Sequence, residues 1–189
     1  LEDFCYKCPK CGKEFTMKGE GNKIECSACG NGATMDDYYQ FHPFEGAIIP
    51  ESPFDWVEQE RMDIIKEIRE NPDYYFEDEC QIGNLDEYKL VGDNKTSFIV
   101  GEGKIRVDHT GMHYRGTRNG EPYEFDVDYN NLFTLITEVD SSFFNFYLRG
   151  EYFDVFPKHQ TVGKFSLLVE EMFVPHIPCK SVGNKLSSA

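Results

Sequence analysis

The sequence predicts a mainly β protein of the α+β class, with a small cysteine-rich unit, a connecting helix and a larger antiparallel β-domain. Two closely spaced cysteine pairs occur within the first 30 residues, and short alternating segments follow one another between residues 74 and 156. Helical patterns at residues 53–70 and 161–174 lie on either side of those segments. Paired cysteines are typical of a metal-stabilised unit, and alternation with a period of two is typical of strands.

The composition is that of a folded and acidic protein. The 189 residues carry a formal net charge of -15, and 15% of them are aromatic, which is too much apolar mass for a disordered chain. The charge opposes long-range attraction to nucleic acid or to an anionic membrane. The sequence has no apolar run of about 18 residues that could span a bilayer. Seven cysteines, four of them in tight pairs, favour the reducing cytoplasm.

The cysteine pairs carry the strongest functional signal. Each is a Cys-x-x-Cys turn followed by glycine, and the pairs are Cys8 with Cys11 and Cys26 with Cys29. Such a turn directs two thiolates at one point, and the glycine accepts the positive φ of the turn. Two turns at the end of a hairpin predict a closed tetrahedral cage for one structural metal ion, with no position left for metal catalysis. Zinc is the usual occupant, and iron is the alternative.

The other three cysteines are assigned different roles. Cys5 precedes Cys8 at the same spacing and could compete as a ligand, but the proline and glycine around the Cys8 pair favour that pair. Cys80 and Cys179 are interpreted as small apolar residues or exposed thiols.

Residues 1–45 are expected to form the ribbon and an aromatic connector. Residues 15–17 and 23–25 predict two short strands, joined by the turn-forming segment Gly19-Glu20-Gly21-Asn22. The connector that follows is rich in aromatic residues, so we expect it to pack against the fold.

Residues 46–73 contain the clearest helix signals. Ser52 is a favourable N-cap, Pro53 suits the first helical position, and Asn71-Pro72 predicts the end. Trp56 projects away from the apolar stripe of this helix, and we expect the ribbon to dock there. The stripe comprises Phe54, Val57, Ile64, Ile65 and Ile68.

Residues 74–175 predict a small antiparallel sandwich or barrel that is capped by a C-terminal helix over residues 161–174. Turn-forming residues separate the alternating segments at short intervals, and Gly101-Glu102-Gly103 predicts a turn or bulge. Residues 176–189 are expected to be a tail. The predicted strands are 75–82, 87–91, 97–100, 104–107, 112–116, 123–129, 132–138, 143–148 and 152–156.

A basic cluster on two neighbouring strands is the second candidate site. Lys104, Arg106, His113 and Arg115 alternate with apolar residues, so they share one solvent face and could bind a phosphorylated head group or another anion. The competing interpretation is cross-strand ion pairing, which explains the alternation without any ligand.

A hairpin signal favours the second interpretation. Asn119-Gly120 predicts a type I′ turn. Counting outward from this turn places Glu124 opposite Arg115 and Asp126 opposite His113, so acidic partners are expected beside the basic residues.

Catalytic motifs are absent from the sequence. The five histidines form no His-x-x-x-His or His-Glu-x-x-His pattern, and there is no Gly-x-Ser-x-Gly segment. Gly101-Glu102-Gly103 lacks the third glycine and the following helix of a nucleotide-binding loop.

The segment from Cys8-Pro-Lys-Cys11 through Cys26-Ser-Ala-Cys29, with the Trp56 helix after it, resembles a C-terminal extension of bacterial lysophosphatidate (1-acylglycerol-3-phosphate) acyltransferase-like proteins. The resemblance implies a rubredoxin-like zinc ribbon in an accessory segment of a phospholipid-biosynthesis enzyme. These acyltransferases act through a His-x-x-x-x-Asp motif, which none of the histidines here begins, so no active-site residue is carried over.

The strands and final amphipathic helix resemble a PH or GRAM-like domain, in which the C-terminal helix plugs an open barrel. This similarity implies a fold and not a ligand.

We therefore expect a non-catalytic, zinc-binding accessory module that serves in interaction, regulation or positioning at the membrane. Because the chain begins with Leu1, we expect a catalytic domain upstream in the same polypeptide, and the other expected partners are a membrane surface or a protein. Two alternatives remain. A nucleic-acid- or protein-binding ribbon is one, although residues 1 to 40 carry five Lys against seven acidic residues. An independent enzyme with a site assembled from distant residues is the other.

Overall fold

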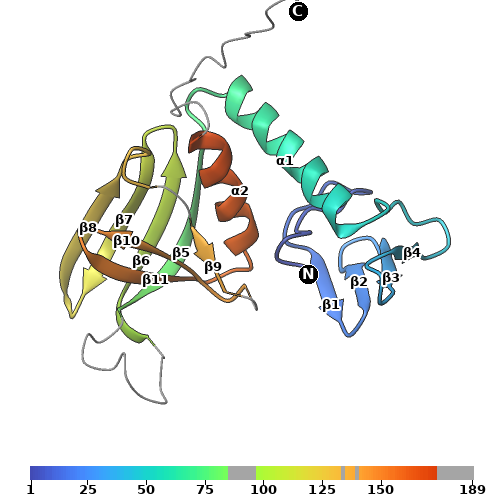
Figure 1. Cartoon of the computed structure of the whole chain (residues 1–189), viewed down its shortest axis with the longest axis horizontal. Helices are drawn as coiled ribbons and strands as arrows, with labels where there is room; N and C mark the ends of the chain where they lie inside the picture. Colours follow the sequence, from blue (N-terminus) through green and yellow to red (C-terminus); the bar gives the residue numbers. More distant parts are fainter. Residues whose placement is uncertain (85–96, 133–134, 139–140, 174–189) are drawn as a thin grey trace, which may run out of the picture.

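Two antiparallel sheets with two helices between them form the protein (Figure 1). A computed structural model describes residues 1–84, 97–132, 135–138 and 141–173. The four-stranded sheet belongs to the N-terminal part of the chain, and the seven-stranded sheet to the rest. The fold is therefore mostly β, as the sequence predicts.

The four-stranded sheet is a simple meander. Its first hairpin has Glu20 opposite Lys23, so the turn consists of Gly21 and Asn22, inside the predicted segment. The first strand begins later than predicted, because Phe15 has a φ of 56°, which is not a strand conformation. The strands are β1 (Met17–Glu20), β2 (Lys23–Cys26), β3 (Gly32–Met35) and β4 (Phe41–Pro43).

Helix α1 (Pro53–Glu70) begins and ends as predicted. The Ser52 hydroxyl accepts a hydrogen bond from the backbone N–H of Asp55 at 3.2 Å, and Asn71 is the C-cap. Pro53 stands in the first turn, where its missing N–H costs nothing.

Trp56 docks α1 on the ribbon, as expected. The side chain is 1% exposed, its Nε1–H donates to the Lys7 carbonyl at 3.0 Å, and its ring meets Phe41 edge to face at 5.7 Å. The predicted apolar stripe is wrong for Phe54, which is 72% exposed, whereas Ile64 is buried. Phe54 lies in the first turn, at the ribbon end of the helix, where the β-domain does not reach it.

The seven-stranded sheet consists of two meanders joined through their first and last strands. β5 pairs with β6 on one side and with β11 on the other, so the order is β8-β7-β6-β5-β11-β10-β9. The strands are β5 (Tyr75–Asn84), β6 (Phe98–Asp108), β7 (Gly111–Arg118), β8 (Glu121–Val127), β9 (Ile136–Thr137), β10 (Phe144–Leu148) and β11 (Glu151–Pro157).

Two predicted strand boundaries are wrong. Residues 98–100 and 104–107 belong to one continuous strand, β6, and the glycines between them lie inside it. The register with β5 shifts where Ile82 pairs with Gly101 and Gly83 with Ile99, so a bulge, the predicted alternative to a turn, fits this position. A Cβ on Gly103 would stand 2.4 Å from the Arg115 carbonyl oxygen, so glycine allows β7 to approach closely and does not mark a turn. Within the predicted strand 132–138, β9 covers only Ile136–Thr137. The predicted strand 87–91 lies outside the described residues.

Helix α2 (Val162–Phe173) covers the sheet and completes its core (Figure 1). Phe165, Leu168 and Met172 are each at most 2% exposed and belong to the same apolar cluster as Ile105 and Phe153 of the sheet. Burial of such side chains supplies about 1.5–3 kcal/mol each, so the helix contributes strongly to the stability of the β-domain.

Lys164 of α2 joins the β-domain to the ribbon. It is only 5% exposed, and its ammonium group lies 2.7 Å from a carboxylate oxygen of Glu14. The same nitrogen lies 4.8 Å from the ring centre of Phe76, 5.8 Å from Tyr6 and 5.9 Å from Phe15. A buried cation is tolerated only when it is paired, and here a carboxylate and three aromatic rings surround it.

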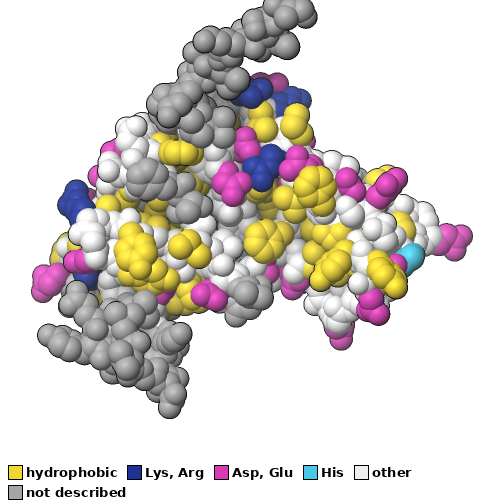
Figure 2. All heavy atoms as spheres, viewed as in Figure 1, with side chains coloured by type: hydrophobic (Ala, Val, Ile, Leu, Met, Phe, Trp, Pro, Cys, Tyr) yellow, Lys and Arg dark blue, Asp and Glu magenta, His cyan; other side chains and the backbone are white. Residues whose placement is uncertain are grey.

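Arg61 forms a second link, between α1 and α2. Its guanidinium contacts Glu58 at 3.2 Å, Glu170 at 3.0 Å and Glu171 at 2.5 Å. Figure 2 shows basic side chains beside acidic ones where the two helices run past each other. Networks of this kind hold elements in register more than they add stability.

Gly163 is expected to be required for the contact between α2 and the N-terminal segment. A Cβ at this position would stand 2.0 Å from the Asp3 carbonyl oxygen. Gly163→Ala is therefore expected to lower the free energy of unfolding by about 1–3 kcal/mol through overpacking. Urea unfolding measures the change. Helix propensity alone predicts the opposite sign, a gain of about 1 kcal/mol, so a stabilised variant would contradict the assigned contact.

Candidate metal centre

Four cysteine sulfurs form a compact group in the ribbon. The Sγ atoms of Cys8, Cys11, Cys26 and Cys29 all lie within 4.8 Å of one another. The Sγ of Cys8 is 3.7 Å from that of Cys29, and the Sγ of Cys11 is 3.8 Å from that of Cys26. The structure thus brings together the four residues that the sequence spacing indicates, and this group could hold a metal ion.

The two turns that carry the sulfurs have nearly identical backbones. Gly12 has a φ of 71° and Gly30 a φ of 72°, as predicted for the residue after each pair. In each turn the glycine N–H donates to the carbonyl of the first cysteine, Cys8 or Cys26, at 2.8 Å. We call the turn of residues 8–12 the first knuckle and that of residues 26–30 the second knuckle.

The cluster lies at the boundary between the ribbon core and solvent. Cys8 and Cys26 are buried, whereas Cys11 and Cys29 are exposed. Each knuckle therefore contributes one sulfur from the inside and one from the outside. Substitution of an exposed cysteine changes the sulfur set without disturbing the packing beneath it.

Asn31 and Thr16 support the sulfurs from behind. The Asn31 side chain lies 3.7 Å from the Cys8 sulfur and exchanges two hydrogen bonds with the backbone of Ile48, at 2.7 and 2.8 Å. Thr16 Oγ1 lies 3.2 Å from the Cys26 sulfur.

Burial alone would raise the pKa of Cys26, but hydrogen bonds from Thr16 and from two backbone N–H groups lower it. The pKa of Cys29 is raised instead, because desolvation and hydrogen bonds with the other three thiols outweigh a backbone hydrogen bond from Asn31 that lowers it. Without a metal, the group therefore shares its protons unevenly.

The remaining described cysteines stand apart from this group. Cys5 lies outside the group of four sulfurs, and it packs in the ribbon core with Met17 and Ile24. Burial raises the pKa of its thiol well above the ordinary value, which disfavours a role as a ligand. Cys80 is 4% exposed, and burial raises its pKa to about 12, so it behaves as a small apolar residue. Cys179 lies outside the described residues.

The basic cluster of β6 and β7 is engaged by acidic neighbours. The predicted register is confirmed, with Arg115 opposite Glu124 and His113 opposite Asp126. His113 Nδ1 and an Arg115 nitrogen each lie 2.6 Å from Asp126.

The other two basic residues of the cluster are also paired. Lys104 lies 2.8 Å from Glu77, and Arg106 lies 3.0 Å from Asp108. Every member of the predicted anion-binding patch therefore has an acidic partner, which favours the ion-pair interpretation.

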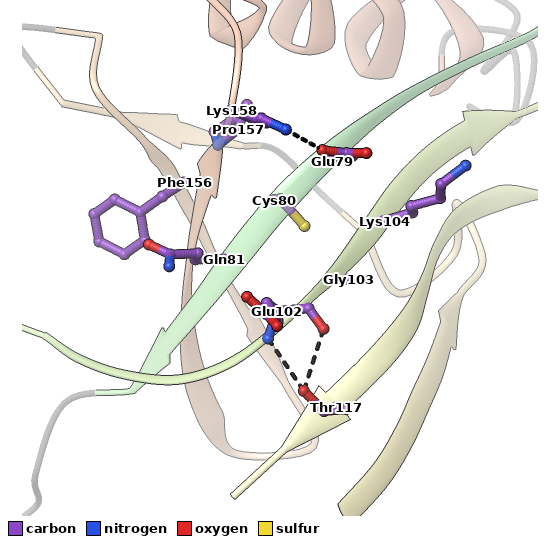
Figure 3. A pocket seen from close by; sticks show the side chains of 10 residues that line it. All are labelled: Glu79, Cys80, Gln81, Glu102, Gly103, Lys104, Thr117, Phe156, Pro157 and Lys158. Carbon is purple, nitrogen blue, oxygen red and sulfur yellow. Dashed lines mark hydrogen bonds and ion pairs between the residues drawn. The ribbon is translucent and has the colours of Figure 1, made fainter. Parts of the chain in front are cut away.

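A cavity of about 720 Å³ lies beside this cluster, where β11, β5, β6 and β7 adjoin (Figure 3). Its charged lining is also paired in part, since Lys158 lies 2.5 Å from Glu79. At the other end of the cavity, the Thr117 hydroxyl hydrogen bonds to the backbone N–H and carbonyl of Glu102. These contacts engage part of the polar lining and do not single out a ligand.

An Asp–His pair that the sequence analysis did not identify lies just before the start of α2. Asp78 is 6% exposed and accepts hydrogen bonds from His159 Nδ1 at 2.6 Å and from Thr161 Oγ1 at 2.7 Å. These contacts lie immediately before the first residue of α2, where a carboxylate stabilises a helix N-terminus. The pair holds the segment that leads from β11 into α2.

Glu60 is a second residue that sequence reasoning missed. It is 3% exposed, and one carboxylate oxygen accepts the Lys7 backbone N–H at 2.7 Å, while Oε2 has no hydrogen-bond partner in the described structure. Burial raises the pKa of this carboxyl to about 8. The spacing of apolar residues along the helix could not reveal the burial of Glu60, because a glutamate at this position is also typical of the solvent-facing side of a helix.

Comparison of the chain with protein-family models, curated proteins and solved structures finds no match. Among the described residues, neither helix combines the length and the apolar character that crossing a membrane requires.

Glu60→Gln is expected to remove a pH dependence of stability. The pKa of about 8 in the folded state exceeds the ordinary 4.5, so the folded protein keeps a proton that the unfolded chain releases, and stability falls as the pH rises from 4.5 to 8. The slope is at most about 1.4 kcal/mol per pH unit. Urea unfolding at pH 5 and pH 8 measures it in wild type, in Glu60→Gln and in the exposed control Glu70→Gln. Equal slopes in wild type and Glu60→Gln would refute the assignment.

Proposed function

We propose that Cys8, Cys11, Cys26 and Cys29 hold one structural zinc ion, and that the chain is a non-catalytic accessory module of a glycerolipid acyltransferase. The observation that carries the zinc proposal is the closed group of four sulfurs. Four thiolates complete a tetrahedral shell, so a metal held there has no free position for water or substrate. Such a site stabilises a fold and does not perform metal catalysis.

The sulfur separations support a tetrahedral metal site. A tetrahedron with Zn–S bonds of about 2.3 Å has edges of about 3.8 Å, and two sulfur pairs in the group are separated by 3.7 and 3.8 Å. Iron forms four-sulfur cages as well, but zinc is the usual occupant of structural ribbons.

The ribbon needs such a cross-link because its apolar core is small. Two of the proposed ligands, Cys8 and Cys26, belong to that core, and a few side chains near Trp56 make up the rest of it. A metal bound by both knuckles stabilises the folded ribbon directly, since the unfolded chain has no preformed site. The core consists of Cys5, Cys8, Met17, Ile24, Cys26, Ala33, Phe41 and Trp56.

The accessory role rests on the resemblance of the cysteine motif to extensions of acyltransferase-like proteins. A PH-like fold of the β-domain is part of the same proposal. Two meanders joined through β5 and β11, with α2 packed into the core, suit an open barrel that its C-terminal helix plugs. Within that proposal the module serves in interaction, regulation or positioning at the membrane.

The described lysines of the ribbon offer little support for nucleic-acid binding. Four of the five lysines in residues 1–40 are engaged, and Lys13 is the fifth. Lys7 pairs with Asp63, Lys23 with Glu25, and Lys10 and Lys18 donate to Gly46 and Gln160. A phosphate backbone would have to displace these partners and overcome the net charge of -15.

An independent enzyme requires a cavity with perturbed titratable groups. Glu60 meets part of that criterion, because it has a raised pKa and lines a cavity between the first knuckle and α1. The residues that line this cavity include no histidine, and Glu60 is already bound to the Lys7 backbone. A binding role therefore fits this cavity better than acid–base chemistry.

Metal content tests the zinc proposal. Protein purified without chelator is expected to contain about one zinc per chain by elemental analysis. Cys11→Ser is expected to lose most of it, because Cys11 is an exposed member of the sulfur group. Cys5→Ser is the matched control and is expected to keep the metal. Loss of zinc in Cys5→Ser with retention in Cys11→Ser would reassign the ligands, and metal-free wild type would reject the site.

The gene context tests the accessory role. The reading frame that encodes this chain is expected to continue upstream of Leu1 into an acyltransferase domain with a His-x-x-x-x-Asp motif. Sequencing of the complete reading frame decides the matter. A frame without that motif would refute the link to acyltransferases, while the zinc proposal would stand on the metal analysis alone.

A further inference from the structure

A groove of about 550 Å³ separates the first knuckle from α1. Cys8 and Pro9 line it on the knuckle side, and Trp56 and Met62 line it on the helix side. Met62 is 62% exposed although it is a large apolar residue. We call this cavity the knuckle–helix groove.

The charged lining of the knuckle–helix groove is predominantly acidic. Glu58, Glu60 and Asp63 of α1 all line it, and Lys7 is its only cationic lining residue among those described. The Lys7 ammonium is already held, 2.6 Å from Asp63 and 3.9 Å from Glu67. The Cys8 thiolate would add negative charge from the other side when a metal is bound. Glu58 and Asp63 are themselves paired, with Arg61 and Lys7, so the lining is unfavourable for an anion but carries little free charge. Because the pKa of Glu60 is about 8, the groove gains a further negative charge only when this carboxyl ionises.

Glu60 gives the groove an unsatisfied acceptor. The residue is 97% buried, and its Oε2 has no partner among the described residues. Burial keeps this carboxyl protonated below its pKa of about 8, and a hydrogen-bond donor or a positive charge that approaches the oxygen favours the ionised form. Acidic side chains alone would not define a site, but this buried and unpaired oxygen points to a missing cationic partner.

We propose that the knuckle–helix groove binds an arginine side chain from a protein partner. The proposal deepens the proposed function and rests on it, since it specifies what the accessory module recognises. The guanidinium would lie toward Glu58 and Glu60, and its methylene stem would pack against Pro9 and Met62.

Arginine fits this combination better than other cationic ligands. Its flat, weakly hydrated group enters partly buried sites at lower cost than an ammonium, and its several donors can serve two carboxylates at once. A metal ion would leave the apolar side of the groove unused. A nucleic-acid partner would bring phosphates into an acidic surface.

The single tryptophan makes the binding test direct. Trp56 lines the groove, and its indole N–H, which donates to Lys7, gives the only indole signal of the chain. Zinc-loaded, 15N-labelled full chain is titrated with N-acetyl-arginine amide and, separately, with the neutral isostere N-acetyl-citrulline amide. Only the arginine compound is expected to move the indole signal, with half-saturation in about the millimolar range for so small a ligand.

Charge-neutral variants locate the binding. In titrations above the Glu60 pKa of about 8, Glu60→Gln is expected to weaken the affinity about tenfold, as loss of a charged hydrogen-bond partner does. Glu58→Gln, at a partly exposed position, is expected to weaken it by a smaller factor and keeps the test open if Glu60→Gln fails to fold. Glu79→Gln removes the same charge from the cavity of Figure 3 and is expected to leave the affinity unchanged.

Three results would overturn the proposal: no saturable shift with the arginine compound, equal shifts with citrulline, or an equal effect of Glu79→Gln and Glu60→Gln. Metal content of the same samples separates this failure from that of the proposed function. Zinc-loaded protein that ignores arginine would reject only the groove proposal, whereas metal-free protein would reject the zinc site.

Discussion

The backbone of Lys7, beside the first cysteine of the sulfur group, is the constraint on which the arrangement of the molecule depends. Its N–H donates to Glu60 at 2.7 Å, and its carbonyl accepts the Trp56 indole at 3.0 Å. Trp56 and Glu60 are four residues apart and therefore share one face of α1. Two contacts to a single residue fix both the position and the rotation of the helix. Arg61, the next residue, then carries this orientation to α2 and hence to the β-domain.

The junction between ribbon and β-domain is built from groups that are costly when isolated. Phe15 has a positive φ, which costs about 1–3 kcal/mol for a bulky residue, and Lys164 places a cation in a nearly buried position. The contacts that offset these two costs involve both residues. The φ of Phe15 sets its ring against Tyr6 at 5.4 Å, and the ammonium of Lys164 lies over both rings and beside Glu14. The two parts of the chain are thus held by a specific polar contact inside an apolar surface.

The features that local chemistry determines were predictable from the sequence, and those that depend on distant segments were not. The Cys-x-x-Cys turns, the Ser52 cap and the Asn119-Gly120 hairpin register each follow from a few neighbouring residues. Gly101-Glu102-Gly103 predicts a turn or bulge, and a register shift does occur beside Gly101. Gly103 instead allows the close approach of another strand, which glycine alone does not distinguish from a bend. Lys164 and Glu60 look like surface residues of amphipathic helices, and only the packing of the ribbon against them makes them buried. The candidate metal centre was accordingly predictable, whereas the knuckle–helix groove was not.

The pairing of β5 with β11 has a consequence for the order of folding. β5 is the first strand of its sheet and β11 the last, so their contact closes a loop that includes all the other strands. The entropic cost of that closure delays it until after the local hairpins form. During synthesis the ribbon and α1 emerge early and have their partners at hand, but the edge of β5 stays open until residues 151–157 leave the ribosome. A nascent chain stalled before that point would present an unpaired strand edge, the feature that chaperones and aggregation both recognise.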